Sequence, residues 1–197
     1  MTDWTALNYV VVDVEGNGQQ PPDLVELAAV PIVAGVIGEP VSWLVKPALP
    51  IRNFATRIHG LTDKAVADAP AFEKIAADVL KALDADALIA HNAHVDIGVL
   101  QRHLGDWECP EVFDTLKLAR RLLLGRESYK LGTLVEAFKL DEGLDESLTP
   151  HRATYDALVT ARLILRLANI RDDRPLTLEE LRGDPPGGGD DEPATLF

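Results

Sequence analysis

The stretch YVVVDVE, from Tyr9 to Glu15, predicts the central strand of a sheet. Its run of β-branched and apolar side chains is typical of a strand buried on both faces. Residues i and i+2 of a strand project from the same face, so Asp13 and Glu15 point into one layer, about 7 Å apart at about 3.3 Å per residue. Carboxylates in a buried strand are costly unless a cation or hydrogen bonds replace the lost water. The pair therefore either ends the strand or belongs to a metal site.

A third carboxylate follows a second predicted strand. Ala87 to Ala90 predicts a short buried strand, and Val95 to Leu104 predicts a helix. Asp96 shares the apolar side of that helix with the residues three and four positions further on, so its side chain points inward. An inward carboxylate needs a compensating partner, which is either a metal ion or an ion pair with Arg102 or Arg120.

A fourth carboxylate and a histidine open the last long helix. The sequence TPHR, from Thr149 to Arg152, predicts a capped helix start, and the apolar residues that follow keep helical spacing. Asp156 flanks this apolar stripe. His151 precedes it by five residues, so the two side chains need not share a face. A histidine at this point either caps the helix in solvent or accepts a proton from a metal-bound water.

Three motifs occur in one order along the chain: Asp13-x-Glu15, His91-Asn92-x-x-x-Asp96 and His151-x-x-x-x-Asp156. In order and spacing they resemble the DEDDh, or DnaQ-like, 3′–5′ exonuclease family, which is typified by the proofreading subunit of bacterial DNA polymerase III. Three flanking segments resemble the same family: Val25 to Ala28, Ile58 to Thr62 and Phe113 to Leu116. The resemblance covers about the first 170 residues.

The resemblance implies an α/β fold of the RNase H-like type, with a mixed five-stranded sheet flanked by helices. The sequence is compatible, because Val25 to Val33 and Val36 to Lys46 predict the second and third strands, with turns at Gly35 and Gly38. Two further sets of apolar residues keep helical spacing and predict core-facing helices: Phe72, Ile75, Ala76, Val79 and Leu80, and Leu131, Leu134, Val135 and Phe138.

The resemblance also implies a cofactor and a mechanism. The four carboxylates Asp13, Glu15, Asp96 and Asp156 would hold two divalent cations, and His151 would be the general base. Such sites hydrolyse the terminal phosphodiester with a hydroxide nucleophile, stabilise the leaving 3′-oxygen and release nucleoside 5′-monophosphates. Oxygen ligands favour Mg²⁺ or Mn²⁺ over zinc. We assign neither His91 nor His94 to metal, since the first is expected to close a strand and the second to face solvent.

The substrate-binding residues depart from the family pattern. The family commonly has Asp-x-Glu-Thr-Thr-Gly, whereas this chain has Gly16-Asn17-Gly18 after the second carboxylate. Gly16 therefore offers only its backbone N–H to the terminal sugar, and Gln19 replaces the usual apolar wedge. The resemblance implies that Ile58 and His59 border the nucleotide pocket and that Asn92 contacts the substrate. A structural role at the end of a helix that terminates in glycine is the alternative for His59.

Composition predicts one domain, residues 1–170, followed by an acidic, flexible tail rich in Pro and Gly, residues 171–197. The single cysteine, Cys109, excludes an internal disulfide. The sequence shows neither a signal peptide nor an apolar run of about 18 residues, so we expect a cytoplasmic protein with no membrane partner.

The formal net charge of −13 disfavours nonspecific nucleic-acid binding, which depends on basic residues. Eight acidic and three basic residues between Arg171 and Phe197 contribute −5 of this charge, which leaves −8 for the first 170 residues. Four basic residues cluster elsewhere in the sequence: Arg120, Arg121, Arg126 and Lys130. They line either a substrate channel or a solvated helix face.

The chain ends in Leu196-Phe197 after the acidic segment. This end resembles bacterial sliding-clamp ligands that finish in Leu-Phe, although Pro193 stands where their motif normally has Gln. The tail therefore either docks on a clamp or polymerase or is an inert terminus.

Three functions remain open. The favoured one is a 3′–5′ exonuclease acting on single-stranded or frayed 3′ ends of DNA, in proofreading or repair. The first alternative is an RNA exonuclease similar to ribonuclease T or oligoribonuclease, because discrimination depends on contacts to the 2′-position. The second is a non-catalytic nucleic-acid or polymerase accessory module, against which the complete set of four carboxylates and His151 argues.

Overall fold

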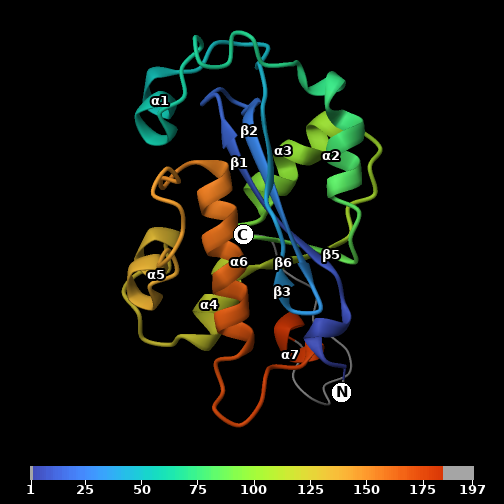
Figure 1. Cartoon of the computed structure of the whole chain (residues 1–197), viewed down its shortest axis with the longest axis vertical. Helices are drawn as coiled ribbons and strands as arrows, with labels where there is room; N and C mark the ends of the chain where they lie inside the picture. Colours follow the sequence, from blue (N-terminus) through green and yellow to red (C-terminus); the bar gives the residue numbers. More distant parts are fainter. Residues whose placement is uncertain (1, 184–197) are drawn as a thin grey trace, which may run out of the picture.

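The computed structural model describes residues 2–183, which form one mixed sheet with helices on both faces (Figure 1). The strands are β1 Tyr9–Gly16, β2 Leu24–Val33, β3 Val36–Ile37, β4 Val41–Leu44, β5 Ala87–Ala90 and β6 Glu111–Asp114. Their order is β3-β2-β1-β5-β6, and β4 pairs with β2. β1 is antiparallel to β2 and parallel to β5, and β5 is parallel to β6. The predicted mixed sheet is confirmed.

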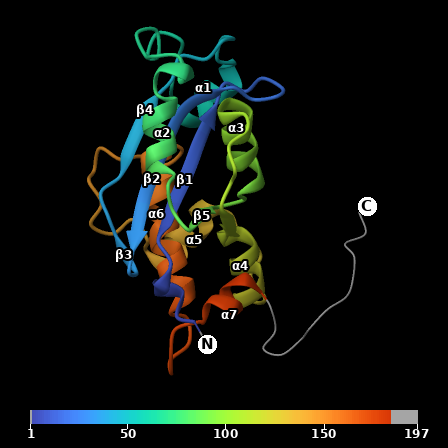
Figure 2. The ribbon, with the colours of Figure 1, turned by 90° about the vertical axis from the view of Figure 1, so that its right-hand side faces the viewer.

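The helices form two layers around the sheet (Figures 1 and 2). They are η1 Trp4–Ala6, α1 Asn53–His59, η2 Phe72–Lys74, α2 Ala76–Ala82, α3 His94–Leu104, α4 Thr115–Leu122, α5 Leu131–Phe138, α6 Ala153–Ala168 and α7 Leu178–Arg182. One face of the sheet packs against α4 to α7, and the other packs against α2 and α3. Within residues 2–183, no helix has the length and apolarity needed to cross a membrane.

The alternation of β1 side chains decides which layer receives the acidic pair. Tyr9 and Val11 belong to the core under α6, whereas Val10 and Val12 belong to the core under α2 and α3. Asp13 has the parity of Tyr9 and Val11, as does the carboxylate two residues further on. Both therefore project on the side of α6, which lies across β1 and β2.

The expected third strand, Val36 to Lys46, is two short strands, so the sheet has six strands instead of five. β3 and β4 both pair with β2 and are separated by Gly38-Glu39-Pro40. Gly38 donates its backbone N–H to the Pro31 carbonyl, and a Cβ at Gly38 would lie 2.9 Å from Pro31 Cγ. Pro40 has no N–H to offer a sheet ladder. These features interrupt the edge of the sheet.

The tail was predicted to begin at residue 171, but residues 171–183 pack against the folded domain. Leu176, Leu178 and Leu181 are buried in the same core as α6. Thr177 caps α7 with a reciprocal bond to Glu180. The described part of the predicted tail therefore belongs to the folded unit. The predicted docking residues Leu196-Phe197 lie outside the described residues.

Candidate active site

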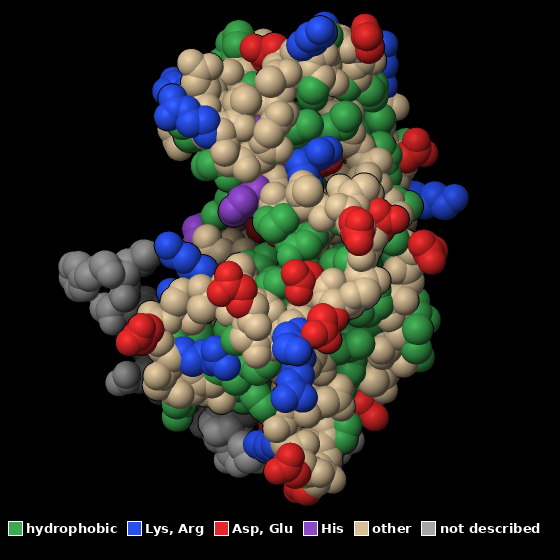
Figure 3. All heavy atoms as spheres, turned by 60° about the vertical axis from the view of Figure 1, so that its left-hand side comes forward, with side chains coloured by type: hydrophobic (Ala, Val, Ile, Leu, Met, Phe, Trp, Pro, Cys, Tyr) green, Lys and Arg blue, Asp and Glu red, His purple; other side chains and the backbone are tan. Residues whose placement is uncertain are grey.

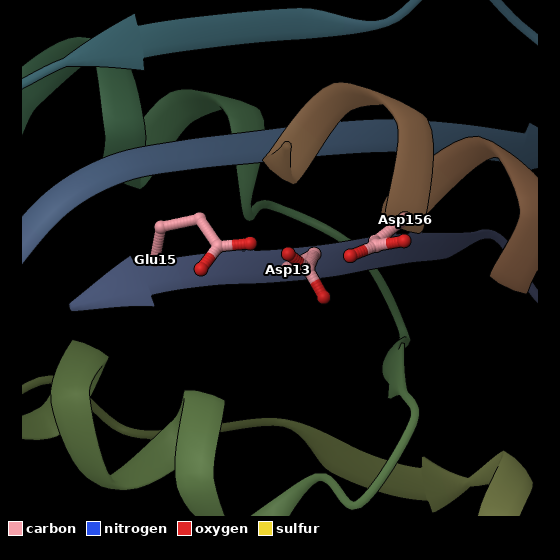
Figure 4. Close-up of side chains that lie close together, drawn as sticks. All are labelled: Asp13, Glu15 and Asp156. Carbon is pink, nitrogen blue, oxygen red and sulfur yellow. The ribbon is translucent and has the colours of Figure 1, made fainter. Parts of the chain in front are cut away.

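Three carboxylates converge where β1 meets α6. Asp13 and Glu15 come from β1 and Asp156 comes from the first turn of α6, and one oxygen of each lies within 4.8 Å of the others (Figure 4). Asp13 Oδ2 is buried and has no hydrogen-bond partner among residues 2–183. A buried carboxylate oxygen without a partner is rare in folded proteins and calls for a cation. The donor set, oxygen only, fits Mg²⁺ or Mn²⁺.

Asp96 lies beside this cluster at the start of α3. It is 6% exposed, and its Oδ1 accepts the backbone N–H of Val14 at 3.0 Å. Arg102, one of the two expected ion-pair partners, instead donates to the Pro22 carbonyl at 2.8 Å. Within residues 2–183, Asp96 forms no ion pair. The structure thus brings three of the four predicted ligands together and holds the fourth next to Val14 of the same strand.

Burial raises the pKa values of all four carboxylates. The pKa of Glu15 rises to about 8, that of Asp96 to about 7 and that of Asp156 to about 6, with desolvation as the main cause in each case. Desolvation and the neighbouring charge of Asp96 hold the pKa of Asp13 well above its usual range. Concentrated acidic groups of this kind ionise together only when positive charge is supplied.

His151 lies in an exposed turn immediately before α6. Its φ of 61° is left-handed, which is uncommon for a residue other than glycine. The positive charge of its protonated ring lowers the pKa of Asp156 against the effect of burial. His151 lines the same cleft as Asp13 and Asp156, so it has access both to solvent and to the acidic cluster.

The cleft beside the cluster has a volume of about 1060 Å³. Asp13, Asp156 and His151 line it together with residues between Glu127 and Glu136 at the start of α5. Figure 3 shows this side of the molecule, where histidines lie in a hollow and both basic and acidic side chains lie along its rim. A cleft of this volume can hold part of a polymeric substrate next to the acidic cluster.

The four clustered basic residues divide into two groups. Arg120 and Lys130 line the cleft. Arg121 instead donates to the backbone carbonyls at the end of α7, and the Arg126 guanidinium lies 4.8 Å from the centre of the Phe138 ring. Only Arg120 and Lys130 are therefore placed to meet a substrate in the cleft.

Asn92 and His91 form the turn between β5 and α3. Asn92 has a φ of 69°, and its backbone N–H donates to Asp114 Oδ1 at 3.1 Å. His91 Nε2 lies 3.0 Å from the Tyr129 carbonyl and Nδ1 lies 2.9 Å from Thr115 Oγ1. Burial lowers the pKa of His91, so the neutral ring donates through Nε2 and accepts at Nδ1. His91 is thus held by the protein, while both residues line the cleft.

His59 differs from the expected substrate contact. It is 5% exposed; its Nδ1 accepts the backbone N–H of Leu61 at 3.0 Å, and its Nε2 lies 3.2 Å from the Gly16 carbonyl. Because Nδ1 accepts, Nε2 carries the proton and donates to Gly16. Both ring nitrogens are occupied by backbone groups. His59 therefore holds Gly16 in place, whereas Ile58 is 54% exposed on the outer side of α1.

The missing hydroxyls after Glu15 have a structural explanation. A Cβ at Gly16 would lie 3.2 Å from Pro22 Cβ, which leaves little room for a threonine. Asn17 is fully buried; its Oδ1 accepts the backbone N–H groups of Gln19 and Asp23, each at 3.0 Å, and its Nδ2 donates to the Leu49 carbonyl in the loop after β4. Asn17 thus organises the loop that the family motif normally forms differently.

Two further carboxylates support the site and were missed in the sequence. Asp114 accepts the backbone N–H groups of Asn92 and Ala93 and caps α4 through Leu116. Glu26, on β2, binds Arg152 next to the His151 turn. Both lie in segments that resemble the family, Val25 to Ala28 and Phe113 to Leu116, but neither carboxylate was assigned a role from the sequence.

A family comparison agrees with this arrangement. The model of the RNase_T family, which is described as an exonuclease, matches residues 10–164. That range contains all four candidate metal ligands and His151.

Individual proteins show the same similarity. Exodeoxyribonuclease 10 of Escherichia coli strain K12 is 36% identical over 159 residues, which cover 81% of this chain and 68% of the relative. The 3′-5′ exonuclease DinG of Bacillus subtilis strain 168 is 34% identical over 182 residues, which cover 88% of this chain but only 19% of the relative. This chain thus spans about a fifth of the length of the B. subtilis protein.

A solved structure of exonuclease X in complex with 5′ overhanging duplex DNA has the same fold. It matches with a TM-score of 0.71 at 32% sequence identity and covers 88% of this chain and 98% of that chain. The expected RNase H-like fold is confirmed.

Proposed function

The chain belongs to the RNase_T exonuclease family, and we propose on that basis that it is a metal-dependent 3′–5′ exonuclease that releases nucleoside 5′-monophosphates from DNA. The observation that carries this proposal is the convergence of Asp13, Glu15 and Asp156, with a buried Asp13 oxygen that has no partner. DNA is favoured because exodeoxyribonuclease 10 and exonuclease X, the latter solved in complex with DNA, are among the similar proteins. We place the activity at single-stranded or frayed 3′ ends, in proofreading or repair.

The four carboxylates Asp13, Glu15, Asp96 and Asp156 would hold two Mg²⁺ or Mn²⁺ ions. Divalent cations at such a site lower the pKa of water and stabilise charge on a phosphodiester. The raised pKa values mean that Glu15 and Asp96 carry protons near neutral pH until cations are bound. Metal binding should therefore release protons.

His151 is the proposed general base. Its imidazole would take the proton from the attacking water as the new oxygen–phosphorus bond forms and the bond from phosphorus to the leaving 3′-oxygen breaks. The leaving 3′-oxygen would take up a proton from solvent, and the exposed position of His151 lets the ring pass its own proton to solvent. Asp156 lies in the same cleft as His151.

The substrate would run from the acidic cluster into the cleft. We propose that the backbone of Gly16, the exposed Ile58 and the turn at Asn92 contact the terminal nucleotide. His59 supports this surface through its bond to Gly16. Arg120 and Lys130 would face phosphates further along the strand.

The test follows 5′-labelled single-stranded DNA, single-stranded RNA and a duplex with a 3′ mismatch, each with Mg²⁺ or Mn²⁺. Wild type should shorten DNA from its 3′ end, and Asp13→Asn should not. His151→Asn should lower kcat about 100- to 10,000-fold, the usual contribution of acid–base catalysis. Asparagine is chosen because it tolerates the left-handed backbone at this position better than alanine does.

The possible contrary outcomes are distinct. A ladder that persists in Asp13→Asn would assign the activity to a contaminant. Faster shortening of RNA would make the protein a ribonuclease. Binding of DNA without turnover in either metal would favour the accessory-module alternative.

A further inference from the structure

β2 contains a single buried charge at the level of the acidic cluster. Glu26 is 4% exposed and lies directly opposite Glu15 in the antiparallel register of β1 and β2. A carboxylate at this depth requires hydrogen-bonded partners of opposite charge. Burial is the main cause of the raised pKa of Glu15; the charge of Glu26 raises that pKa further, and the charge of Arg152 acts in the opposite direction. The sheet therefore places a fifth carboxylate beside the four candidate ligands.

All of the side-chain partners of Glu26 come from the two residues that follow His151. Arg152 Nε donates to Oε2 at 2.9 Å and Arg152 Nη2 donates to Oε1 at 2.6 Å. The backbone N–H of Ala153 donates to Oε2 at 3.0 Å. A two-pronged bond of this kind fixes the plane of the guanidinium as well as its distance. The strand of Glu26 is thus joined rigidly to a segment 126 residues away.

The same contacts determine how α6 begins. Arg152 is the N-cap residue of α6 and makes no side-chain cap bond of its own. The Glu26 carboxylate takes that role from the neighbouring strand, at the end of the helix where negative charge is favourable. Because Asp156 lies in the first turn of α6, its distance from β1 depends on this cap.

The turn before the helix is in a conformation that needs support. His151 has a φ of 61°, and unfavourable backbone conformations persist only where the surroundings impose them. Arg152 and Ala153, tied to Glu26, are the residues that impose a fixed exit from this turn. The position of the His151 ring therefore depends on the ion pair.

Resting on the proposed exonuclease activity, we infer that Glu26 and Arg152 are positioning residues for the general base. Their ion pair couples the strand that carries Glu15 to the turn that carries His151, so that the base and the carboxylates keep one geometry. Neither residue touches the reacting atoms, and the ion pair neutralises Glu26 so that it does not compete for cations.

The test is a double-mutant cycle with Glu26→Gln and His151→Asn, measured as kcat and KM on single-stranded DNA. Glu26→Gln keeps the volume and one acceptor but loses the charge-assisted pair, and kcat should fall about 10- to 100-fold, as for other supporting contacts of active sites. KM and the half-saturating Mn²⁺ concentration should stay unchanged. In the His151→Asn background, Glu26→Gln should cause little further loss, because both changes act through one group.

Two additional variants define the comparison. Arg152→Lys keeps the charge but lacks the planar fork, so its kcat should lie between those of wild type and Glu26→Gln. Glu73→Gln, at an exposed glutamate in η2, is the matched control and should behave as wild type. Thermal unfolding of each variant reports any general loss of fold.

The outcomes separate this inference from the proposed function. An inactive wild type with both metals would overturn the exonuclease itself. An active wild type in which Glu26→Gln and His151→Asn have additive effects would overturn the positioning role alone. A raised half-saturating Mn²⁺ concentration in Glu26→Gln would also overturn it and would make Glu26 a residue of the metal site.

Discussion

The acidic cluster stores unfavourable electrostatic energy in the metal-free protein. Asp13, Glu15 and Asp156 lie in one small space, and burial raises the pKa of each. A group whose pKa is raised on folding is held with its proton more tightly in the folded state than in the unfolded chain. Protons and cations therefore compete for the same oxygens, and pH should control the stability of the metal-free form.

The metal-free protein should lose stability as pH rises. Glu15 has an ordinary pKa of 4.5 and a folded pKa of about 8. Between these values the folded state binds more protons than the unfolded state, so the contribution of Glu15 is fully present below pH 4.5 and is lost as pH rises through about 8. Asp96, whose folded pKa is about 7, acts in the same direction. Differential scanning calorimetry in EDTA should show Tm falling across this window.

Added Mn²⁺ should reverse this trend, with a larger rise of Tm at the alkaline end of the window, where fewer protons must be displaced. Glu15→Gln provides the control, because it removes a carboxyl group whose folded pKa is about 8 and should flatten the pH dependence. A Tm that rises with pH in EDTA would contradict the assigned burial of these carboxylates.

Sequence motifs located these carboxylates because each lies in a short local pattern. Asp13 and Glu15 follow strand parity, and Asp96 follows helical spacing. The Glu26–Arg152 pair has no such pattern, because its members are far apart in sequence and meet only when α6 packs on β2. The metal and base assignments remain predictions, while the spatial convergence of Asp13, Glu15 and Asp156 is observed.

At the level of elements, α4 and the start of α5 form the wall of a cleft that has the acidic cluster at one end. Arg120 comes from α4, and Lys130 precedes α5. Within residues 2–183, neither side chain forms a hydrogen bond or ion pair with another protein group. Their positive charge is available to phosphates, in a protein whose overall charge is −13.

Removing either basic side chain should weaken the binding of single-stranded DNA and make that binding less dependent on salt. Arg120→Ala and Lys130→Ala should each reduce the slope of log affinity against log salt by about 0.7, the value for one lost phosphate contact on a single strand. Fluorescence anisotropy with the inactive Asp13→Asn protein measures the affinity. Arg126→Ala is the control of equal charge, since Arg126 packs over Phe138 outside the cleft lining. Equal slopes in all three variants would show that DNA does not bind in the cleft.

Most elements could be predicted from hydrophobic patterning, and the misses have physical causes. β1, β5 and α3 were expected within one residue of their observed bounds, because their cores alternate or repeat clearly. The prediction of a single third strand was wrong because Pro40 and the close approach of Gly38 to Pro31 interrupt an otherwise apolar run. α6 begins after the predicted TPHR cap, since its capping carboxylate comes from another strand.

At the level of the whole molecule, α7 closes the core beneath α4 and α6. Leu178 and Leu181 are buried there, and Arg121 of α4 donates to carbonyls at the end of α7. Composition placed this segment in a tail because it is rich in charge, yet its charges pair with one another: Glu180 binds both Arg171 and Arg174. Residues 171–183 are therefore part of the cooperative unit.

Leu181→Ala should destabilise the protein by about 2–5 kcal/mol, the range for removing a buried leucine side chain. Leu124→Ala is the matched control; Leu124 is 83% exposed, and its change should cost less than about 0.5 kcal/mol. Urea unfolding followed by tryptophan fluorescence measures both. Equal stability of the two variants would mean that α7 is not coupled to the core.

The first and last described segments meet at one end of the molecule, where Leu178 donates its backbone N–H to the Thr2 carbonyl and Asp3 bridges to Thr177 (Figure 1). A polypeptide that continued past both ends would thus enter and leave through neighbouring points, away from the acidic cluster. A domain with this geometry can be inserted into a loop of a larger protein, because both of its connections lie at one place on its surface.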